Sequence, residues 1–451
     1  MDPLWQAAVQ FSLSHPKFTA LEANIHPPAR VSSVPFGLER LGGILSNLMD
    51  LTVSAEGKSD HSKLIVVDAL YQKSLDEYLT LKPRAFIGSR NMVDSASSFY
   101  HDEAVIVKGP AAVVTLLNYQ SDIVWARNQA KAAANHPINA ADESLLQSVL
   151  DRLDVLRKTP TLVKGQGWVN VQPIQISAND EVRNLDSGII PRIMAAEHTI
   201  DLYDKIAYNW PLAIALKEAM ARGVKVRVIM DQQNSSGALG NSAFPYMIAQ
   251  APRRLPGGRE TQDTVDETGK QIQEADLPVR WFVPFRPGKS FASKDRSDLA
   301  QEIHAKTIII DGRLALFGSA NFDSLTWTGG FREYSVWVDD QALASASARE
   351  FDKLWNHPLL TVSHKAWLGA EPPPQALVDS INASIKAAGC DTSTELCNSS
   401  NVLQGGKNFP EKGPKRELIR SILAADADRI RALLPAKVLQ NAQGLPQCRQ
   451  L

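Results

Sequence analysis

Two segments of the chain repeat one pattern of residue types that suits chemistry at phosphorus. The segments are DHSKLIVVD (residues 60–68) and IHAKTIIID (residues 303–311). Each contains a histidine, one spacer, a lysine, four mostly aliphatic residues and an aspartate: His61, Lys63 and Asp68 in the first, and His304, Lys306 and Asp311 in the second. We predict that these six residues are catalytic.

A phosphodiester is anionic, so its oxygens must be neutralised before a nucleophile attacks, and lysines supply the positive charge. One imidazole can attack phosphorus and form a covalent phosphohistidine. The other can protonate the leaving oxygen and then activate water or an alcohol. Each imidazole needs an acidic partner that holds its ring and tautomer. Because attacker and proton donor must lie on opposite sides of one phosphorus, two facing half-sites would build one active site.

Each repeat continues with a Gly-Ser pair that is followed by further polar residues. The sequences are GSRNMVDS (residues 88–95) and GSANFDS (residues 318–324). We predict that their serines and asparagines bind the phosphoryl oxygens: Ser89, Asn91, Ser319 and Asn321. Asp102 and Glu333 occupy equivalent places further on, where they either orient the histidine of the facing half or cap a strand.

The spacing of the repeats indicates a duplicated domain with one insertion. The two histidines are 304 − 61 = 243 residues apart, whereas the Gly-Ser pairs are 318 − 88 = 230 residues apart, so the first copy has 13 extra residues within 69–86. Residues 102–125 and 333–355 both predict a strand followed by a helix that ends near a tryptophan. Side chains at i and i+2 share a face of a strand, which places each lysine beside its histidine.

The second half has the strand–helix–strand order of an α/β protein. Residues 198–203 and 224–231 predict strands, and residues 211–223 predict a helix with proline in its first turn and glycine at its end. About 135 residues precede the second motif from residue 168, but only 60 precede the first. We expect either a first half that is N-terminally shortened or a chain that is the C-terminal part of a longer one. The predicted domains are a first half, a helical connector, a second half and a C-terminal helical or loop extension: 1–126, 127–166, 167–360 and 361–451.

Composition narrows the class of protein. The chain is 44% hydrophobic with a net charge of −1, so nothing draws it broadly to nucleic acid. The sequence contains no apolar run of transmembrane length and no ordinary signal peptide at its start, and we expect a soluble protein that is cytoplasmic or exported without such a peptide. No His/Cys cluster has metal-site spacing, so we expect neither a metal nor another cofactor. Cys390, Cys397 and Cys448 lie near the C-terminus, with a 390–397 disulfide or free thiols as alternatives.

The sequence HAKTIIIDGRLALFGSAN resembles the signature of the phospholipase D superfamily, His-x-Lys-x4-Asp followed by Gly-Ser-x-Asn. The first copy fits except for its insertion, and the resemblance covers roughly residues 60 to 360. It implies two pseudo-symmetric α-β-α sandwich halves that form one active site without a metal. By position, it also implies that His61 is the nucleophile and His304 the acid/base.

The resemblance leaves several substrates open. We expect a bacterial-type phospholipase D that acts at a phospholipid membrane surface and releases phosphatidic acid and a headgroup alcohol, without an obligate protein partner. Export as a leaderless bacterial effector is a family analogy. The alternatives are a cardiolipin-synthase-type phosphatidyltransferase, which would be expected to bring an N-terminal anchor, a nuclease, which the net charge disfavours, and a phosphate-binding module without turnover.

Two further groups of residues each allow two interpretations. His101 serves local packing or lies at the rim of the site. Trp281, Phe282 and Phe285 are core residues or line a pocket for a lipid headgroup.

Overall fold

The computed structural model describes most of the second half and part of the first. The described residues are 61–67, 84–90, 100–109, 112, 115, 168–174, 184–232, 241–251, 253–254, 260–261, 273–283, 302–323, 326, 333–387, 403 and 423. The predicted connector 127–166, the insertion between β1 and β2, and the three cysteines lie outside them, as does most of the predicted terminal helix 417–434.

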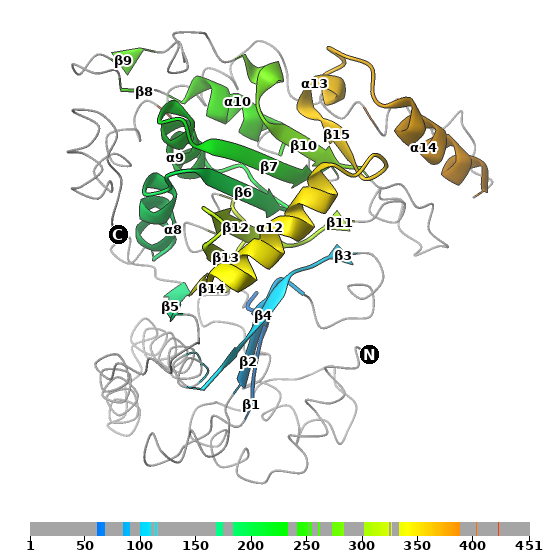
Figure 1. Cartoon of the computed structure of the whole chain (residues 1–451). Helices are drawn as coiled ribbons and strands as arrows, with labels where there is room; N and C mark the ends of the chain where they lie inside the picture. The colour runs from blue at the N-terminus through cyan, green and yellow to red at the C-terminus, as the bar shows by residue number, and fades with distance from the viewer. Residues whose placement is uncertain are drawn as a thin grey trace, which may run out of the picture.

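One mixed sheet of eight strands dominates the structure (Figure 1). Its order is β15-β10-β7-β6-β12-β13-β14-β5. Three neighbouring strands, β10, β7 and β6, run parallel, and the remaining neighbours pair antiparallel. The strands are β5 (Trp168–Ile174), β6 (Thr199–Asp204), β7 (Lys225–Asp231), β10 (Val279–Phe282), β12 (Lys306–Ile310), β13 (Leu314–Gly318), β14 (Glu333–Asp339) and β15 (Thr361–Ser363).

The central strand β12 is buried on both faces, as its continuous aliphatic sequence predicts. Alternate residues of the strand enter two different cores because successive side chains point to opposite faces. Ile308 and Ile310 belong to one core, and Ile309 belongs to the other. The sheet therefore needs a covering layer on each side.

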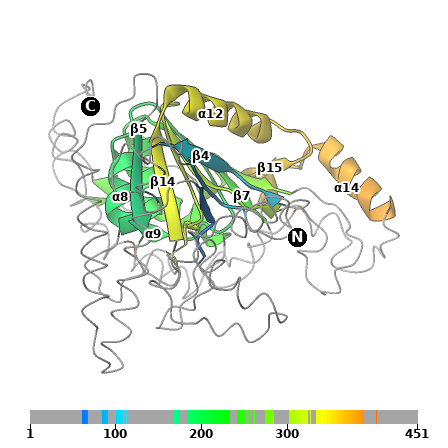
Figure 2. The ribbon, with the colours of Figure 1, turned by 90° about the horizontal axis from the view of Figure 1, so that it is seen from below.

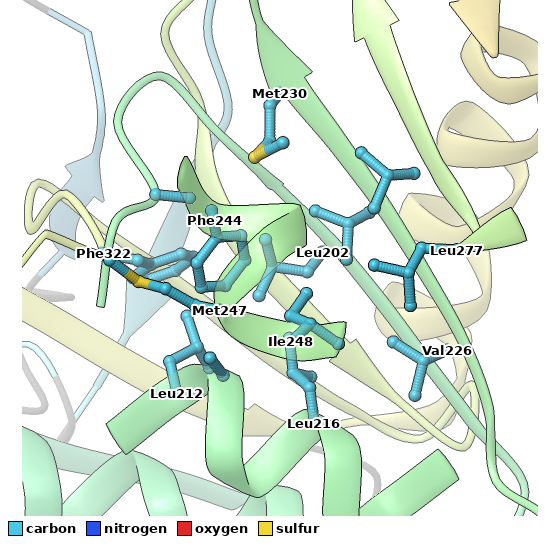
Figure 3. Packing of buried hydrophobic residues seen from close by; sticks show 14 of the residues in the cluster. Leu202, Leu212, Leu216, Val226, Met230, Phe244, Met247, Ile248, Leu277 and Phe322 are labelled. Carbon is cyan, nitrogen blue, oxygen red and sulfur yellow. The ribbon is translucent and has the colours of Figure 1, made fainter. Parts of the chain in front are cut away.

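Three helices cover the first face: α8 (Asn184–Met194), α9 (Trp210–Ala221) and α10 (Ala243–Gln250). Helix α9 begins where the Asn209 side chain accepts a hydrogen bond from the Leu212 N–H at 2.9 Å, with Pro211 in the first turn. Figure 3 shows how the core between these helices and the sheet interlocks, with Leu212 and Leu216 of α9 close to Met247 and Ile248 of α10.

The second face is covered by α12 (Gln341–Trp355) together with a small sheet from the first half. That sheet has the order β1-β2-β4 and is antiparallel, with β1 (Leu64–Val67), β2 (Arg84–Gly88) and β4 (Ala104–Lys108). Figure 2 shows α12 and β4 on the side of the main sheet away from α8 and α9. Since β2 contacts β13 and β14, the two halves share one hydrophobic core.

Two short strands also join the halves directly. β3 (Tyr100–His101) pairs in parallel with β11 (Glu302–Ile303). Asp102 follows β3 and His304 follows β11, so the segment before each of these two residues is bonded to the other half.

The α/β fold class is confirmed, as are the strand–helix–strand order of residues 199–231 and the strand and helix that follow the second motif. The domain boundaries and the pseudo-symmetry of whole halves stay predictions. The boundary placed at residue 360 immediately precedes β15, which pairs with β10 at the edge of the main sheet. Beyond it, α13 (His364–Trp367) and α14 (Gln375–Ala387) follow.

The aromatic residues before the second motif lie in the two cores. Trp281 is fully buried, stacks on Trp367 with ring centroids 4.7 Å apart and donates to His364 Nδ1 at 3.0 Å. Phe282 belongs to the core on the α12 side, and Phe285 lies outside the described residues. Burial of Trp281 and Phe282 supports the packing interpretation over a headgroup pocket. Among the helices that the structure describes, none is long and apolar enough to cross a membrane.

Candidate active site

The register of the β3–β11 pair brings a carboxylate of the first half to a histidine of the second. Ile303 lies opposite His101, and both the His304 and Ala305 N–H groups donate to the His101 carbonyl at 2.9 Å. One residue further along, Asp102 and His304 therefore meet. The Asp102 carboxylate accepts from His304 Nδ1 at 2.8 Å.

The converse pair joins a histidine of the first half to a carboxylate of the second. Glu333 is the first residue of β14 and fully buried, and its Oε1 accepts from His61 Nδ1 at 2.6 Å. Each predicted catalytic histidine thus contacts the acid of the other half. Of the two interpretations of Asp102 and Glu333, the contacts match the orienting one.

Each acid also accepts a hydrogen bond from a serine hydroxyl of its own half. Ser89 Oγ donates to Asp102 at 2.7 Å, and Ser319 Oγ donates to Glu333 at 2.5 Å. Both serines are fully buried. The N–H of Ser89 donates to the Glu103 carbonyl, and the N–H of Ser319 donates to the Tyr334 carbonyl, each within its own half. The serine hydroxyls lie behind the acids, so each chain of contacts runs serine, acid, histidine. Each hydroxyl donates its single proton to an acid, and this contact supports an orienting role, while the role of the serines as phosphoryl ligands stays a prediction.

The glycine before each serine is required by close packing. A Cβ on Gly88 would lie 2.4 Å from Cβ of Ala104, and a Cβ on Gly318 would lie 2.5 Å from Cβ of Ser335. The glycines allow β2 and β13 to approach the next strand closely enough for the serine hydroxyl to reach the acid.

Each lysine contacts its histidine as predicted, although His61, Lys63 and His304 lie just before the strands β1 and β12 and not within them. Lys63 Nζ donates to the His61 carbonyl at 2.5 Å, and Lys306 Nζ donates to the His304 carbonyl. Lys306 is 1% exposed, and burial lowers its pKa because a buried ammonium loses its hydration.

Asp204, which sequence analysis missed, is the carboxylate paired with Lys306 across the sheet. It ends β6 directly opposite Lys306, and the charge of each stabilises the charge of the other. Burial raises the pKa of Asp204 well above its usual value. Its oxygens also accept the Lys205 N–H at 2.7 Å and the Phe322 N–H at 2.6 Å, which fixes the loop that carries Asn321. Only the pairing of β6 with β12 reveals this, so no sequence motif marks it.

Asn321 is the predicted phosphoryl ligand whose placement suits that role best. Its side chain is 9% exposed, and its Oδ1 has no hydrogen-bond partner among the described residues. Buried polar atoms are normally paired, but Oδ1 only accepts hydrogen bonds, so only the Nδ2 group of this amide could donate to a phosphoryl oxygen. Asp68 and Asn91 lie outside the described residues.

Asp311 lies at the far end of β12 from His304, about 20 Å away along an extended strand. Its carboxylate accepts three backbone N–H groups, from Glu197 at 3.0 Å, His198 at 2.7 Å and Thr199 at 2.8 Å. It adopts φ +54° in the turn to β13. This placement does not support the catalytic role predicted for Asp311, because its contacts hold a turn and a neighbouring strand.

The electrostatics of the second histidine favour a neutral ring. Burial lowers the pKa of His304 to about 3, and the charge of Lys306 adds to the effect against the opposing pull of Asp102. Burial alone would raise the pKa of Asp102, but the bonds from His304 and Ser89 outweigh it, so this pKa lies below its usual value. A neutral His304 that donates through Nδ1 to an ionised Asp102 is the stable state.

A second carboxylate beside Asp102 was also missed. Glu103 accepts from Thr307 Oγ1 of β12 at 2.9 Å and from Ser347 Oγ of α12 at 3.2 Å, so it ties the first half to the second. Burial raises the pKa of Glu103 to about 7. It has no equivalent in the second repeat, where Tyr334 follows Glu333, so the comparison of the repeats did not point to it.

His101 contributes its carbonyl to the junction and its ring to packing. The ring meets Tyr203 edge-on, with centroids 5.9 Å apart, and burial lowers its pKa. Within the described part of the chain, no group of three or more His, Cys, Asp or Glu residues could hold a metal ion. Independence from metals remains a prediction.

Residues 189–355 match a family model described as "Cardiolipin synthase, PLD-like domain". None of the curated proteins compared with the chain is similar enough to count as a relative. Phosphatidylserine synthase of Haemophilus influenzae Rd KW20 is 14% identical, with a TM-score of 0.35 over 68% of this chain and 69% of that one.

Two smaller solved structures are also similar. Nuc from Salmonella typhimurium, a phospholipase D family member, is 20% identical, with a TM-score of 0.28 over 42% of this chain and 95% of that one. NucT from Helicobacter pylori is 16% identical, with a TM-score of 0.29 over 42% of this chain and 94% of that one.

Proposed function

We propose that this chain, which belongs to the phospholipase D superfamily, hydrolyses glycerophospholipids to phosphatidic acid and a free headgroup alcohol through a covalent phosphohistidine. The superfamily acts on phosphodiesters, and the proposal concerns the substrate and the intermediate. The crossed pairs His304–Asp102 and His61–Glu333 carry it, because they supply two oriented imidazoles in one site.

The contacts of the two histidines support a two-step displacement. Each Nδ1 contacts a carboxylate, so we assign the reaction at phosphorus to the other ring nitrogen, Nε2. One Nε2 attacks phosphorus while the other protonates the leaving oxygen. The same proton carrier then removes a proton from water, which attacks phosphorus and releases the first histidine.

The remaining residues neutralise and hold the phosphate. Lys63 and Lys306 lie next to the histidines, where each Nζ donates to the carbonyl of its histidine, and supply positive charge to the non-bridging oxygens. We assign the Nδ2 group of Asn321 as a donor to a phosphoryl oxygen, and Asp204 accepts from the Phe322 N–H next to it and lies opposite Lys306. Ser89 and Ser319 do not contact the phosphate in this proposal; they orient the carboxylates of Asp102 and Glu333 by donating hydrogen bonds to them.

The charge of the chain favours a lipid over a polynucleotide as substrate. Phosphate contacts dominate binding to nucleic acids, and the net charge of −1 gives no broad attraction to a polyanion. Phosphatidyl transfer to an alcohol is the second candidate, favoured by the description of the family model. It differs only in that the alcohol replaces water in the second step.

The test uses vesicles of phosphatidylcholine, phosphatidylethanolamine and phosphatidylglycerol, and scores phosphatidic acid and free headgroups with and without added glycerol. His304→Asn should abolish product. The matched control, His198→Asn, alters a ring that is 77% exposed beyond the other end of β12 and should leave the rate unchanged. Transfer products in place of phosphatidic acid would favour the transferase. Cleavage of single-stranded DNA or RNA with no lipid product would refute the proposal and favour a nuclease.

A further inference from the structure

Glu103 links the segment that carries Asp102 to two elements of the second half. Its side chain accepts from Thr307 Oγ1 of β12 at 2.9 Å and from Ser347 Oγ of α12 at 3.2 Å. Asp102 directly precedes it, and Thr307 lies three residues after His304. We infer that Glu103 is a positioning residue that holds the Asp102 carboxylate against His304, an inference that rests on the proposed function of that site.

The backbone of Glu103 is bonded to the serine that orients Asp102. The Glu103 N–H donates to Ser89 Oγ at 3.1 Å, and the Glu103 carbonyl accepts from the Ser89 N–H at 3.0 Å. Ser89 Oγ in turn donates to the Asp102 carboxylate at 2.7 Å. A shift of Glu103 therefore moves both the acid and the hydroxyl that orients it.

The acid of the second half has more support from its sheet. Glu333 begins β14, which pairs with β13 on one side and with β5 on the other. Asp102 lies between β3 and β4, and β4 has β2 as its single neighbour in the part of the chain that the structure describes. Asp102 therefore depends more than Glu333 on side-chain contacts between the halves.

The backbone contacts with the serine recur in the second half, but the carboxyl does not. Tyr334 follows Glu333 as Glu103 follows Asp102. The Tyr334 N–H donates to Ser319 Oγ at 3.0 Å, and its carbonyl accepts from the Ser319 N–H at 3.1 Å. The ring of Tyr334 lies in the core on the α12 side. The backbone contacts thus belong to both halves, whereas the carboxyl that crosses the junction belongs to Glu103.

Glu103 can make this link in its protonated form. Burial of its carboxyl raises its pKa to about 7, and the charge of Glu350 on α12 adds to the effect. A protonated carboxyl has one accepting oxygen and one O–H donor, and the glutamine amide offers an acceptor and donors in the same shape. At pH 6, Glu103→Gln should therefore keep the link to Thr307 and Ser347, whereas Glu103→Ala removes it.

The kinetic test measures kcat and KM at pH 6 on the mixed phospholipid vesicles. Glu103→Ala should lower kcat by about 10–100-fold, since a misplacement of about 1 Å can cost 10²-fold in rate. Its KM should stay within about twofold, because the link acts on the reacting groups and not on the bound lipid. Glu103→Gln should restore both constants to within about threefold of wild type.

Helix α12 offers a matched pair of serine variants. Ser347→Ala should lower kcat by about 3–10-fold, because it removes one hydrogen bond that crosses the junction. Ser345→Ala is the control, since Ser345 Oγ donates to the Gly312 carbonyl at 3.0 Å within the second half. It removes a comparable bond of the same helix and should leave kcat unchanged.

The ring of His304 gives a readout that needs no substrate. In protein labelled with ¹⁵N-histidine, the proton between Nδ1 and Asp102 gives an NMR signal that His304→Asn identifies by its loss. Glu103→Ala should shift this signal or broaden it through exchange with water. Glu103→Gln should leave the signal in place, which a general loss of stability would not explain.

The outcomes separate the inference from the function. An unchanged kcat or an unchanged His304 signal in a folded Glu103→Ala would overturn the inference, as would equal losses in Ser347→Ala and Ser345→Ala. If the melting temperature shows that Glu103→Ala does not fold, the two serine variants decide by the same measurements. No phosphatidic acid from the wild type would refute the proposed function instead, and the His304 signal would then decide whether Glu103 positions Asp102.

Discussion

Asp311 is the residue for which motif and structure imply different roles, and Asp311→Ala separates them. The substitution removes the acceptor of three backbone N–H groups at 2.7–3.0 Å and places alanine at φ +54°. A hydrogen bond to a charged group contributes about 1.5–3 kcal/mol, but these N–H groups lie near the surface and regain water. The left-handed backbone adds about 1 kcal/mol. We expect a total loss of about 3–4 kcal/mol in the free energy of unfolding.

The assay is a denaturant titration paired with kcat on the same sample, well below its melting temperature. Because Asp311 lies far from His304 along β12, kcat should stay within about threefold of wild type. Asp311→Asn is the matched variant, since asparagine tolerates the left-handed region and retains one acceptor oxygen, and it should lose about half as much stability. A kcat lower by 100-fold in a chain of unchanged stability would refute a structural role.

Three further results are expected. Ser319→Ala should lower kcat by about 3–10-fold without changing KM, because it removes one hydrogen bond of roughly 0.5–1.5 kcal/mol behind Glu333; an unchanged kcat would mean that the serine does not position the acid. Gly318→Ala should lower the free energy of unfolding by about 1–3 kcal/mol, because its Cβ would lie 1.9 Å from Oγ of Ser335. Gly369→Ala is the control: it has φ +75° and open space around its Cβ, so it should lower the free energy of unfolding by only about 1 kcal/mol. Equal losses of the two variants in urea titrations would contradict the packing explanation. The raised pKa of Glu103, about 7, means that the unfolded chain releases this proton at a lower pH than the folded chain, so the stability of the wild type falls as pH rises from 4.5 to 8. Glu103→Gln lacks the proton and should therefore gain up to about 3 kcal/mol in free energy of unfolding relative to wild type over that window. A difference between the two that does not change with pH would contradict this explanation.

The sequence predicted what repeats locally and missed what only pairing across the sheet creates. The spacing of the motif placed Lys306 beside His304, although His304 precedes β12, and the equivalent positions of Asp102 and Glu333 suggested their contacts with the facing half. Asp204 was missed because its partner lies 102 positions away in sequence (306 − 204) and no repeat marks it.

At two positions the contacts in the structure suggest another role than the residue type does. A serine near a phosphate motif suggests a ligand, but the hydroxyl of Ser319 is directed to Glu333 because Gly318 brings β13 close to β14. An aspartate at the end of the motif suggests catalysis, but in Asp311 the turn conformation directs the carboxylate to backbone N–H groups. Both outcomes depend on local backbone geometry that the residue types do not fix.

A double-mutant cycle between the halves tests the central claim that they build one active site. The variants are Glu333→Gln, His61→Asn and the two combined, and the quantity is kcat for phosphodiester cleavage. If Glu333 acts only by orienting and charging the ring of His61 at 2.6 Å, the double variant should be no slower than His61→Asn alone. Losses that multiply would show that the two residues act independently, and would contradict a shared site.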